Sequence, residues 1–173
     1  MSLETTVGLV EGEADLEGIL ALQRASLAVT ADGFVTVQHT LEVLKAMHAL
    51  APSVVARAGG EVVAYALVMP PEARAWVPIL EPMFVELEAL LPNTRFYVMG
   101  QVAVAAKHRG TGLFDALYAE HRARYASRWD VCVTEVATRN TRSMRAHARV
   151  GFETVKTYRD ATDEWALLAW RWR

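Results

Sequence analysis

The strongest local signal in the sequence is the stretch Val102-Ala103-Val104-Ala105-Ala106-Lys107-His108-Arg109-Gly110-Thr111-Gly112-Leu113. An apolar run that predicts a strand leads into two glycines, and a helix is predicted to begin at the second. Glycine lets the backbone approach a ligand closely, and a helix start offers N–H groups and the positive end of the helix dipole. Three basic side chains add positive charge. The stretch therefore predicts a pyrophosphate cradle, and a solvated basic turn is the structural alternative.

Two well-known phosphate loops do not fit this stretch. It lacks the Gly-Lys-Ser/Thr ending of a P-loop, whose side chains hold magnesium and the γ-phosphate. It also lacks the third glycine of the dinucleotide-binding fingerprint, and no strand with a ribose-binding acid follows at the required distance. Nucleotide hydrolysis and hydride transfer are therefore not predicted.

Hydrophobic periodicity elsewhere predicts strands and helices that alternate in the middle of the chain. The predicted strands are 6–11, 53–58, 61–69, 96–106, 131–138, 152–158 and 164–172, and the predicted helices are 15–28, 37–50, 112–127 and 140–150. The alternation indicates a parallel pair in the middle, and the Gly59-Gly60 turn and the last two strands indicate antiparallel hairpins on either side. The sequence therefore predicts an α/β fold with a mixed sheet.

Residues 70–95 interrupt this regular pattern. Five of the six prolines lie in the stretch, and proline limits regular structure. Only residues 83–91 carry a pattern that allows about two helical turns. We expect an irregular, partly helical insertion between the third and fourth strands.

Length and composition limit the class of protein. A chain of 173 residues is predicted to form a single domain, and 53% hydrophobic with 22% charged residues is typical of a folded protein. The net charge of −2 argues against a broad surface for nucleic acid or anionic lipid. No apolar run approaches the roughly 18 residues of a membrane span, and the acidic N-terminus is unlike a signal peptide. We expect no nucleic-acid partner and no membrane partner.

Cysteine and histidine usage argues against a metal centre. Cys132 is the only cysteine, which excludes an internal disulfide and a thiolate zinc cluster and fits a reducing compartment. The five histidines never occur at the i, i+4 spacing of a helical metal site. We expect a cytoplasmic protein without a bound metal.

A second segment follows the predicted strand 131–138 and reads Asn140-x-x-Ser143-x-x-x-His147-x-x-x-Gly151-Phe152. Asn140 can cap the helix that follows, and Gly151 can end it. Combined with the earlier Lys107-x-x-Gly110-x-Gly112, this segment resembles the GNAT N-acetyltransferase superfamily. That superfamily has a Gln/Arg-x-x-Gly-x-Gly/Ala loop for coenzyme A after its fourth strand and an Asn-x-x-Ala-x-x-x-Tyr-x-x-x-Gly-Phe segment after its fifth. The order of elements also matches, so the resemblance covers nearly the whole chain.

The resemblance implies a fold and a reaction. The implied fold is a mixed, mostly antiparallel sheet with a splayed parallel central pair, flanked by helices, in one acetyltransferase-like domain over residues 1–173. The implied reaction moves an acetyl group from acetyl-coenzyme A to an amine of a small molecule, peptide or protein, by direct attack in a ternary complex. A non-catalytic module that binds acyl-coenzyme A is the alternative, because the tyrosine common in the superfamily's second motif is missing here.

The resemblance also implies which residues bind acetyl-coenzyme A. Backbone N–H groups of the splayed fourth strand and of the glycine loop would hold the thioester and the pyrophosphate. The implied residues are Val102, Ala103, Val104, Lys107, His108, Arg109, Gly110, Thr111, Gly112, Leu113, Asn140 and Ser143. Lys107 stands where Gln or Arg is usual, and Ser143 stands where alanine is common.

Two residues are candidates for proton transfer. An alkylamine with a pKa of ~10.4 must lose a proton before it attacks. Glu135 lies in a hydrophobic strand, where ribosomal-protein-alanine-type members carry a base glutamate, and pairing with Arg139 or Arg142 is its structural alternative. His147 stands where many members carry the tyrosine that protonates the leaving thiolate. A buried histidine bonded to a neighbouring carbonyl is its structural alternative.

Two further expectations concern the acceptor and the assembly. Residues 70–95 are predicted to form a partly mobile cover that presents Trp76, Phe84 and Leu87 to the acceptor amine. Trp170 and Trp172 share one face of the last strand and are the candidate contact of a homodimer. No readable motif in the sequence identifies the acceptor.

Overall fold

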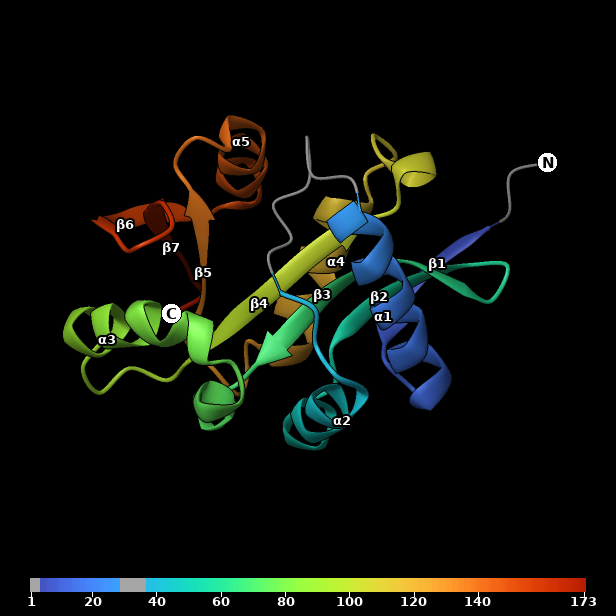
Figure 1. The fold of residues 1–173 in the computed structure, drawn as a ribbon, viewed down its shortest axis with the longest axis horizontal. Coiled ribbons are helices and arrows are strands. Elements are labelled where there is room, and N and C mark those ends of the chain that lie inside the picture. The colour runs from blue at the N-terminus through green and yellow to red at the C-terminus, as the bar shows by residue number, and fades with distance from the viewer. Residues whose placement is uncertain (1–3, 29–36) are drawn as a thin grey trace. The chain divides into compact units, whose positions relative to one another are not determined.

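The computed structural model describes residues 4–28 and 37–173, which form seven strands and five α-helices (Figure 1). The strands are β1 (Thr5–Leu9), β2 (Val54–Ala58), β3 (Glu61–Met69), β4 (Phe96–Val104), β5 (Val131–Ala137), β6 (Glu153–Arg159) and β7 (Glu164–Arg171). The helices are α1 (Glu13–Ala28), α2 (Leu41–Leu50), α3 (Glu81–Leu90), α4 (Leu113–Tyr125) and α5 (Thr141–Val150). In this described part of the chain, every helix is too short or too polar to cross a membrane.

The strands form one mixed sheet in the order β1-β2-β3-β4-β5-β7-β6. The pairs β1–β2, β2–β3, β5–β7 and β6–β7 are antiparallel, and β4–β5 is parallel. The predicted fold, a mostly antiparallel sheet with a parallel central pair and flanking helices, is therefore confirmed. The parallel register runs from Phe96 opposite Val131 to Val98 opposite Val133. At the next residue of β4, the carbonyl of Met99 accepts a hydrogen bond from the Thr134 hydroxyl, at 2.9 Å.

The chain groups into two compact units. The first unit is Met1–Val68 with Gly100–Arg124, and the second is Met69–Met99 with Tyr125–Arg173. Strand β4 contributes its first four residues to the second unit and its last five to the first. The single domain over residues 1–173 stays a prediction.

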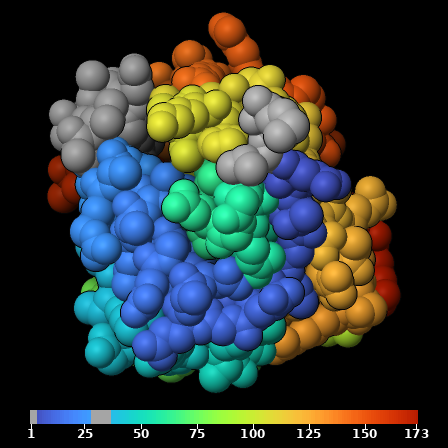
Figure 2. Space-filling model, turned by 90° about the vertical axis from the view of Figure 1, so that its right-hand side faces the viewer, coloured from blue at the N-terminus to red at the C-terminus, as the bar shows by residue number. Residues whose placement is uncertain are grey.

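In the first unit, α1 and α4 lie on opposite sides of β2 and β3. Figure 1 shows α1 in front of these strands and α4 behind them, and Figure 2 shows α1 in blue and α4 in gold on either side of the β2–β3 turn. Helix α1 packs so closely that a Cβ added at Gly18 would lie 2.8 Å from Val62 Cγ2. On α4, the buried His121 ring lies with Nε2 3.1 Å from the carbonyl oxygen of Ala66 in β3. The close contacts of both helices place the core of this unit around β3.

The core of the second unit is rich in aromatic rings. The buried ring of Tyr97 in β4 packs against Tyr125, Trp129 and Trp172, with centroid distances of 5.8, 4.7 and 5.9 Å. Trp170 packs against Phe152 and Trp172. The two tryptophans expected at a dimer contact are thus half-buried within their own unit, and the homodimer stays a prediction.

Residues 70–95 are more regular than the sequence predicts. They form two 3₁₀ turns, Pro71–Trp76 and Pro78–Leu80, followed by α3. The prolines do not break these elements because they lie at helix starts, where the missing N–H is not needed. The Arg74 guanidinium further ties the first turn to α3 through hydrogen bonds with Glu81, at 2.8 Å from Nε, and with Glu88.

The expectation that this segment presents Phe84 and Leu87 to an acceptor is wrong. Each of these side chains is only 1% exposed, because the apolar face of α3 packs into the core of the second unit. Trp76, in contrast, is 40% exposed. Of the three predicted contact residues, only Trp76 offers surface to a ligand.

Candidate functional site

The glycine turn between β4 and α4 has the geometry of an open backbone cradle. Strand β4 ends at Val104, a 3₁₀ turn covers Ala106–His108, and α4 begins at Leu113. Gly110 and Gly112 have φ of +73° and +84°, a backbone conformation that residues with a side chain rarely adopt. Among the described residues, nothing lies within 4 Å of a Cβ built at either glycine. A ligand can therefore approach the backbone directly at both positions.

Hydrogen bonds within the glycine turn hold its backbone in this conformation. The Thr111 hydroxyl donates to the carbonyl of His108 at 2.6 Å, and Arg109 Nε donates to the carbonyl of Val104 at 3.3 Å. The amide of Ala116 donates to the carbonyl of Gly112 at 3.0 Å, so the hydrogen bonding of α4 starts at the second glycine. Lys107 is exposed beside this helix start.

These features fit a pyrophosphate. Exposed basic side chains, open glycines and a helix start lie together in one continuous loop, which Figure 2 shows in yellow at the surface of the first unit. The side chain of Leu113 is buried, so only its backbone could face a ligand. Contact of residues 102–113 with coenzyme A stays a prediction.

In the second unit, Asn140 and Ser143 build the start of α5. The Asn140 side-chain oxygen accepts a hydrogen bond from the Ser143 amide at 3.1 Å, which is the predicted helix cap. The amide of Gly151 closes the other end on the carbonyl oxygens of His147 and Ala148. The Asn140 carbonyl group is thus used for capping, and contact of Asn140 or Ser143 with coenzyme A stays a prediction.

His147 has the geometry of a buried histidine that is bonded to a neighbouring carbonyl. The side chain is 1% exposed, and its ring packs edge-on against Phe152 at 5.2 Å. Nδ1 lies 2.8 Å from the carbonyl oxygen of Ser143, and a carbonyl can only accept, so the ring proton is on Nδ1. Desolvation lowers the pKa of His147 to about 4. This contact with Ser143 is the one expected of a buried histidine bonded to a neighbouring carbonyl, and a role of His147 in protonating the leaving thiolate stays a prediction.

Glu135 lies on β5 with a phenol as its partner. Its carboxylate accepts a hydrogen bond from the hydroxyl of Tyr158 on β6. Burial raises the pKa of Glu135 to about 7, although the Tyr158 hydrogen bond acts in the opposite direction. Arg139, one of the two arginines considered as structural partners, instead donates to Asp163 at 2.6 Å. The carboxyl group is thus ready to exchange a proton near neutral pH.

The face around Glu135 is completed by an ion pair. Glu135 and Lys156 are each opposite Leu167 of β7, so both side chains lie on the same face of the sheet. The Lys156 ammonium pairs with Glu86 of α3. This pair connects β6 to the helical segment that precedes β4 in the same unit.

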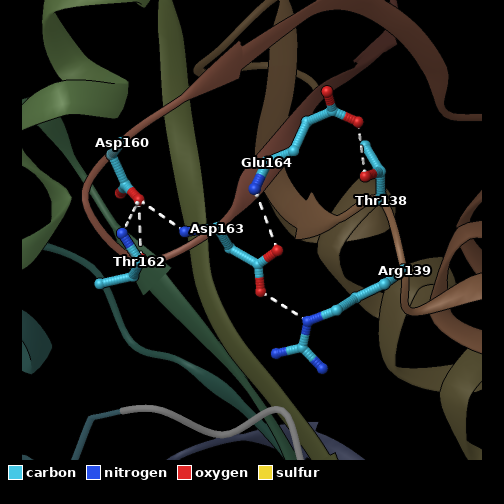
Figure 3. Close-up of polar contacts among 6 residues, drawn as sticks. All are labelled: Thr138, Arg139, Asp160, Thr162, Asp163 and Glu164. Atoms are coloured by element: carbon cyan, nitrogen blue, oxygen red, sulfur yellow. Dashed lines mark hydrogen bonds and ion pairs between the residues drawn. The ribbon is translucent and has the colours of Figure 1, made fainter.

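The β6–β7 turn is held by its own polar contacts, which Figure 3 shows. Asp160 accepts hydrogen bonds from the amides of Thr162 and Asp163, at 2.8 and 3.0 Å. Asp163 in turn accepts from Arg139, at the end of β5. These bonds fasten the turn to the end of β5 and so hold Tyr158, two residues before Asp160, beside Glu135.

Two sets of polar contacts are not predicted from the sequence. Tyr158 is one, and a cluster around Gln23 and Gln101 in the first unit is the other. The available signal was a polar residue inside an apolar run: Gln23 lies in a helix with a buried face, and Gln101 lies in β4. That signal marks a buried polar group but does not identify its partner.

A comparison with known protein families decides the membership of this chain. The acetyltransferase (GNAT) family matches residues 27–152. The chain belongs to this family. The predicted transfer of an acetyl group from acetyl-coenzyme A to an amine is thereby confirmed at the level of the family, with acetyl-coenzyme A as the cosubstrate. Among residues 4–28 and 37–173, no group of three or more His, Cys, Asp or Glu side chains could hold a metal.

Solved structures show the same fold in other acetyltransferases. YncA from Salmonella typhimurium, solved with acetyl-CoA, is 18% identical with a TM-score of 0.68, covering 98% of this chain and 94% of its own. A ribosomal-protein-alanine N-acetyltransferase from Brucella melitensis is 22% identical with a TM-score of 0.68. The match covers 95% of this chain and 98% of that one. A chain of the NatC complex bound to Gag peptide and CoA is 15% identical with a TM-score of 0.71, at 99% and 100% coverage. No curated protein sequence matches this acetyltransferase closely enough to serve as a relative.

Proposed function

We propose that this chain is an N-acetyltransferase whose loop at residues 107–113 holds the pyrophosphate of acetyl-coenzyme A. The observation that carries the proposal is the open glycine turn at the start of α4, where two positive-φ glycines leave the backbone accessible. The thioester would lie along the backbone of Val102–Val104, just before the loop, where N–H groups can stabilise a developing oxyanion. Lys107 and Arg109 add positive charge for the phosphates.

For the acceptor amine we propose Glu135 as the general base, acting directly or through a water. An amine that arrives protonated must lose its proton, and a carboxyl group with a pKa of about 7 is partly ionised at neutral pH and still basic enough to accept it. The Tyr158 hydroxyl donates to the carboxylate and holds it in place. The deprotonated amine then attacks the thioester carbonyl directly in a ternary complex. As the C–N bond forms the C–S bond breaks, coenzyme A leaves as the thiolate, and the proton that the nitrogen releases converts this thiolate to the free thiol.

For the acceptor surface we propose the segment 70–95, through Trp76. This side chain is exposed, and α3 of the same segment is tied by the Lys156–Glu86 ion pair to the strand that carries Tyr158. The segment thus connects an exposed aromatic group with the face that holds Glu135, all within the second unit. The acceptor is an amine of a small molecule, a peptide or a protein.

The test is release of free coenzyme A from acetyl-coenzyme A across a panel of amines, measured against the background without amine. We expect at least one amine to raise the release rate well above that background. Binding of acetyl-coenzyme A is measured in parallel by the shift in melting temperature. Binding without turnover on any amine would contradict the enzyme and support the acyl-coenzyme A binding module instead.

A further inference from the structure

In the described part of the chain, the parallel ladder between β4 and β5 covers three residue pairs and ends at Val98 opposite Val133. Both strands continue beyond this point, β4 to Val104 and β5 to Ala137. A ladder that ends inside a sheet takes partners away from backbone groups, and a buried group must then find another partner. The end of this ladder therefore calls for a physical cause.

The direction of the β5 amides shows which bond would continue the ladder. The amide of Val131 donates to the carbonyl of Arg95, just before β4, at 3.4 Å. Backbone groups alternate in direction along a strand, so every second amide of β5 is directed at β4. Four residues further along both strands, the amide of Glu135 is thus directed at the carbonyl of Met99.

The carbonyl of Met99 has a different donor. The hydroxyl of Thr134 donates to it at 2.9 Å. A bond from the Glu135 amide would have made Met99 and Thr134 the next pair, but the described register stops one pair earlier. A threonine hydroxyl therefore takes the place that the ladder would give to a backbone amide, which is how such hydroxyls compete with sheet pairing.

This exchange of donors lets the ladder end at little cost. Met99 and Thr134 are 2% and 4% exposed, so a carbonyl without a donor would be buried there. The hydroxyl satisfies the carbonyl, and the Glu135 amide no longer holds β5 at pairing distance from β4. Paired strands lie only ~4.8 Å apart, which leaves no room for a ligand between them. The residues of this contact all belong to the second unit.

We propose that Thr134 is a positioning residue for acetyl-coenzyme A, because its hydroxyl ends the ladder at Val98 and so keeps the β5 side of the later β4 backbone open to the cosubstrate. The inference rests on the proposed placement of the thioester along Val102–Val104, which lies past the last described pair. Backbone groups that a neighbouring strand does not use are available to a ligand. Thr134 acts through the Met99 carbonyl and needs no contact with the cosubstrate.

The first experiment follows hydrogen exchange of single amides by NMR, in protein without ligand. In wild type, the Glu135 amide is expected to exchange faster than the Val133 amide, which lies within the ladder. Thr134→Ala frees the Met99 carbonyl for the Glu135 amide, so the exchange of this amide is expected to slow by about 10-fold. Thr134→Ser keeps a hydroxyl and is expected to exchange like wild type.

The direction of the change separates positioning from a purely structural role. Loss of a hydrogen bond that only stabilises the sheet would loosen β5 and speed the exchange at Glu135. Faster or unchanged exchange in Thr134→Ala would therefore overturn the proposal. If this variant does not fold, the wild-type comparison decides, because a Glu135 amide as protected as that of Val133 would show that the ladder does not end there.

The second experiment measures the dissociation constant of acetyl-coenzyme A by calorimetry. Thr134→Ala is expected to weaken binding by about 5- to 10-fold, because the cosubstrate must first break the added pair. Thr134→Ser is expected to restore most of the affinity. Thr157→Ala is the matched control, since Thr157 is an exposed threonine of β6 in the same unit, and is expected to bind like wild type.

The outcomes distinguish this inference from the proposed function. A folded Thr134→Ala variant with wild-type affinity would overturn the role of Thr134 and leave acetyl transfer intact. Wild type that binds acetyl-coenzyme A but acetylates no amine would contradict the enzyme and leave the inference standing, because neither readout requires turnover. Wild type that does not bind acetyl-coenzyme A would overturn both.

Discussion

The glycine loop before α4 and the face around Glu135 are built on different principles. The loop offers backbone groups, exposed by Gly110 and Gly112, and its own hydrogen bonds hold it in shape. The face around Glu135 offers a side chain whose properties depend on Tyr158, Asp160 and burial, all contributed by distant parts of the sequence. A site made of backbone groups can therefore be predicted from residues that are close in the sequence. A site made of side chains depends on neighbours that only the fold brings together.

The two regions should respond differently to substitution. A loop built from backbone is sensitive to added atoms and insensitive to charge-neutral changes of its side chains. A carboxyl group with a shifted pKa is sensitive to loss of its own basicity and to changes in its neighbours. The experiments below test that contrast, from the largest expected effect on turnover to the smallest.

The largest effect is expected for Glu135→Gln, which keeps the size of the side chain but removes the basic site. If Glu135 is the base, turnover at saturating acceptor should fall by about 10²–10⁴-fold, with acetyl-coenzyme A binding unchanged. Glu153→Gln, an exposed glutamate at the start of β6, is the control. Turnover within twofold of wild type in Glu135→Gln would rule out the base role.

The next effect concerns binding of acetyl-coenzyme A. At 100 times its dissociation constant, the ligand should stabilise the wild-type fold by about 2.7 kcal/mol. Gly112→Asp places a carboxylate where the pyrophosphate is proposed to lie and should abolish this stabilisation, measured as the ligand-induced shift in melting temperature. Gly60→Asp is a matched control, because Gly60 also has a φ of +84° and open space around its Cβ position. A full ligand-induced shift in Gly112→Asp would show that the loop is not the binding site.

A smaller effect is expected on the pH dependence of kcat/KM. If ionised Glu135 is the active form, kcat/KM rises with pH through about 7. Tyr158→Phe removes a donor that lowers the pKa of Glu135, so the rise should move up by about one pH unit. Asp160→Asn removes a charge that raises this pKa, so the rise should move down by less. Shifts in the same direction in both variants would contradict the assignment of the rise to Glu135.

The smallest effect on turnover is expected for His147→Phe. Because the His147 ring is neutral and bonded to Ser143, the variant should keep its rate within about threefold of wild type and retain the shape of the pH profile. If the rise or the fall of turnover with pH disappears in His147→Phe, His147 acts as a proton donor in the reaction.

Stability gives a separate check on His147. The pKa of His147 is lowered to about 4 in the folded state, below the unfolded value of ~6.5, so the unfolded state binds the extra proton between these pH values. The free energy of unfolding should therefore decrease as the pH falls, by about 2 kcal/mol between pH 7.5 and pH 5 for this residue. His147→Phe should remove this part of the pH dependence, measured by urea unfolding at the two pH values. An unchanged dependence would place the ring in contact with solvent.

The sequence by itself determined the order of elements, the fold and the position of the glycine loop. The signals that predict them are local: the hydrophobic periods, the Gly59-Gly60 turn and the two motifs. Local signals can be recognised without knowing which residues make contact in the folded chain. Asn140 as the cap of α5 is of the same kind, because a cap bonds within three residues of itself.

The tertiary structure decided what each polar side chain faces. The apolar pattern predicts a helix from residue 37, whereas α2 begins at Leu41, with Thr40 as its cap. The backbone of Val37 and His39 is instead bonded to Gln101 and Gln23, which are 64 and 16 residues away in sequence. Long-range hydrogen bonds of this kind outweigh the helix preference of a local hydrophobic pattern. The spacing of residues in the sequence does not predict such bonds.

The same reason explains the corrections at the site. Glu135 obtains its partner from β6, and Phe84 and Leu87 are buried because they lie on the apolar face of α3, which the prolines of this segment do not indicate. His39 and His147 are alike as residues, yet a Gln23 amide makes Nδ1 an acceptor in one and a Ser143 carbonyl makes Nδ1 a donor in the other. Residue type fixes which protons a side chain can hold, and only the packed neighbours decide which of its atoms holds one.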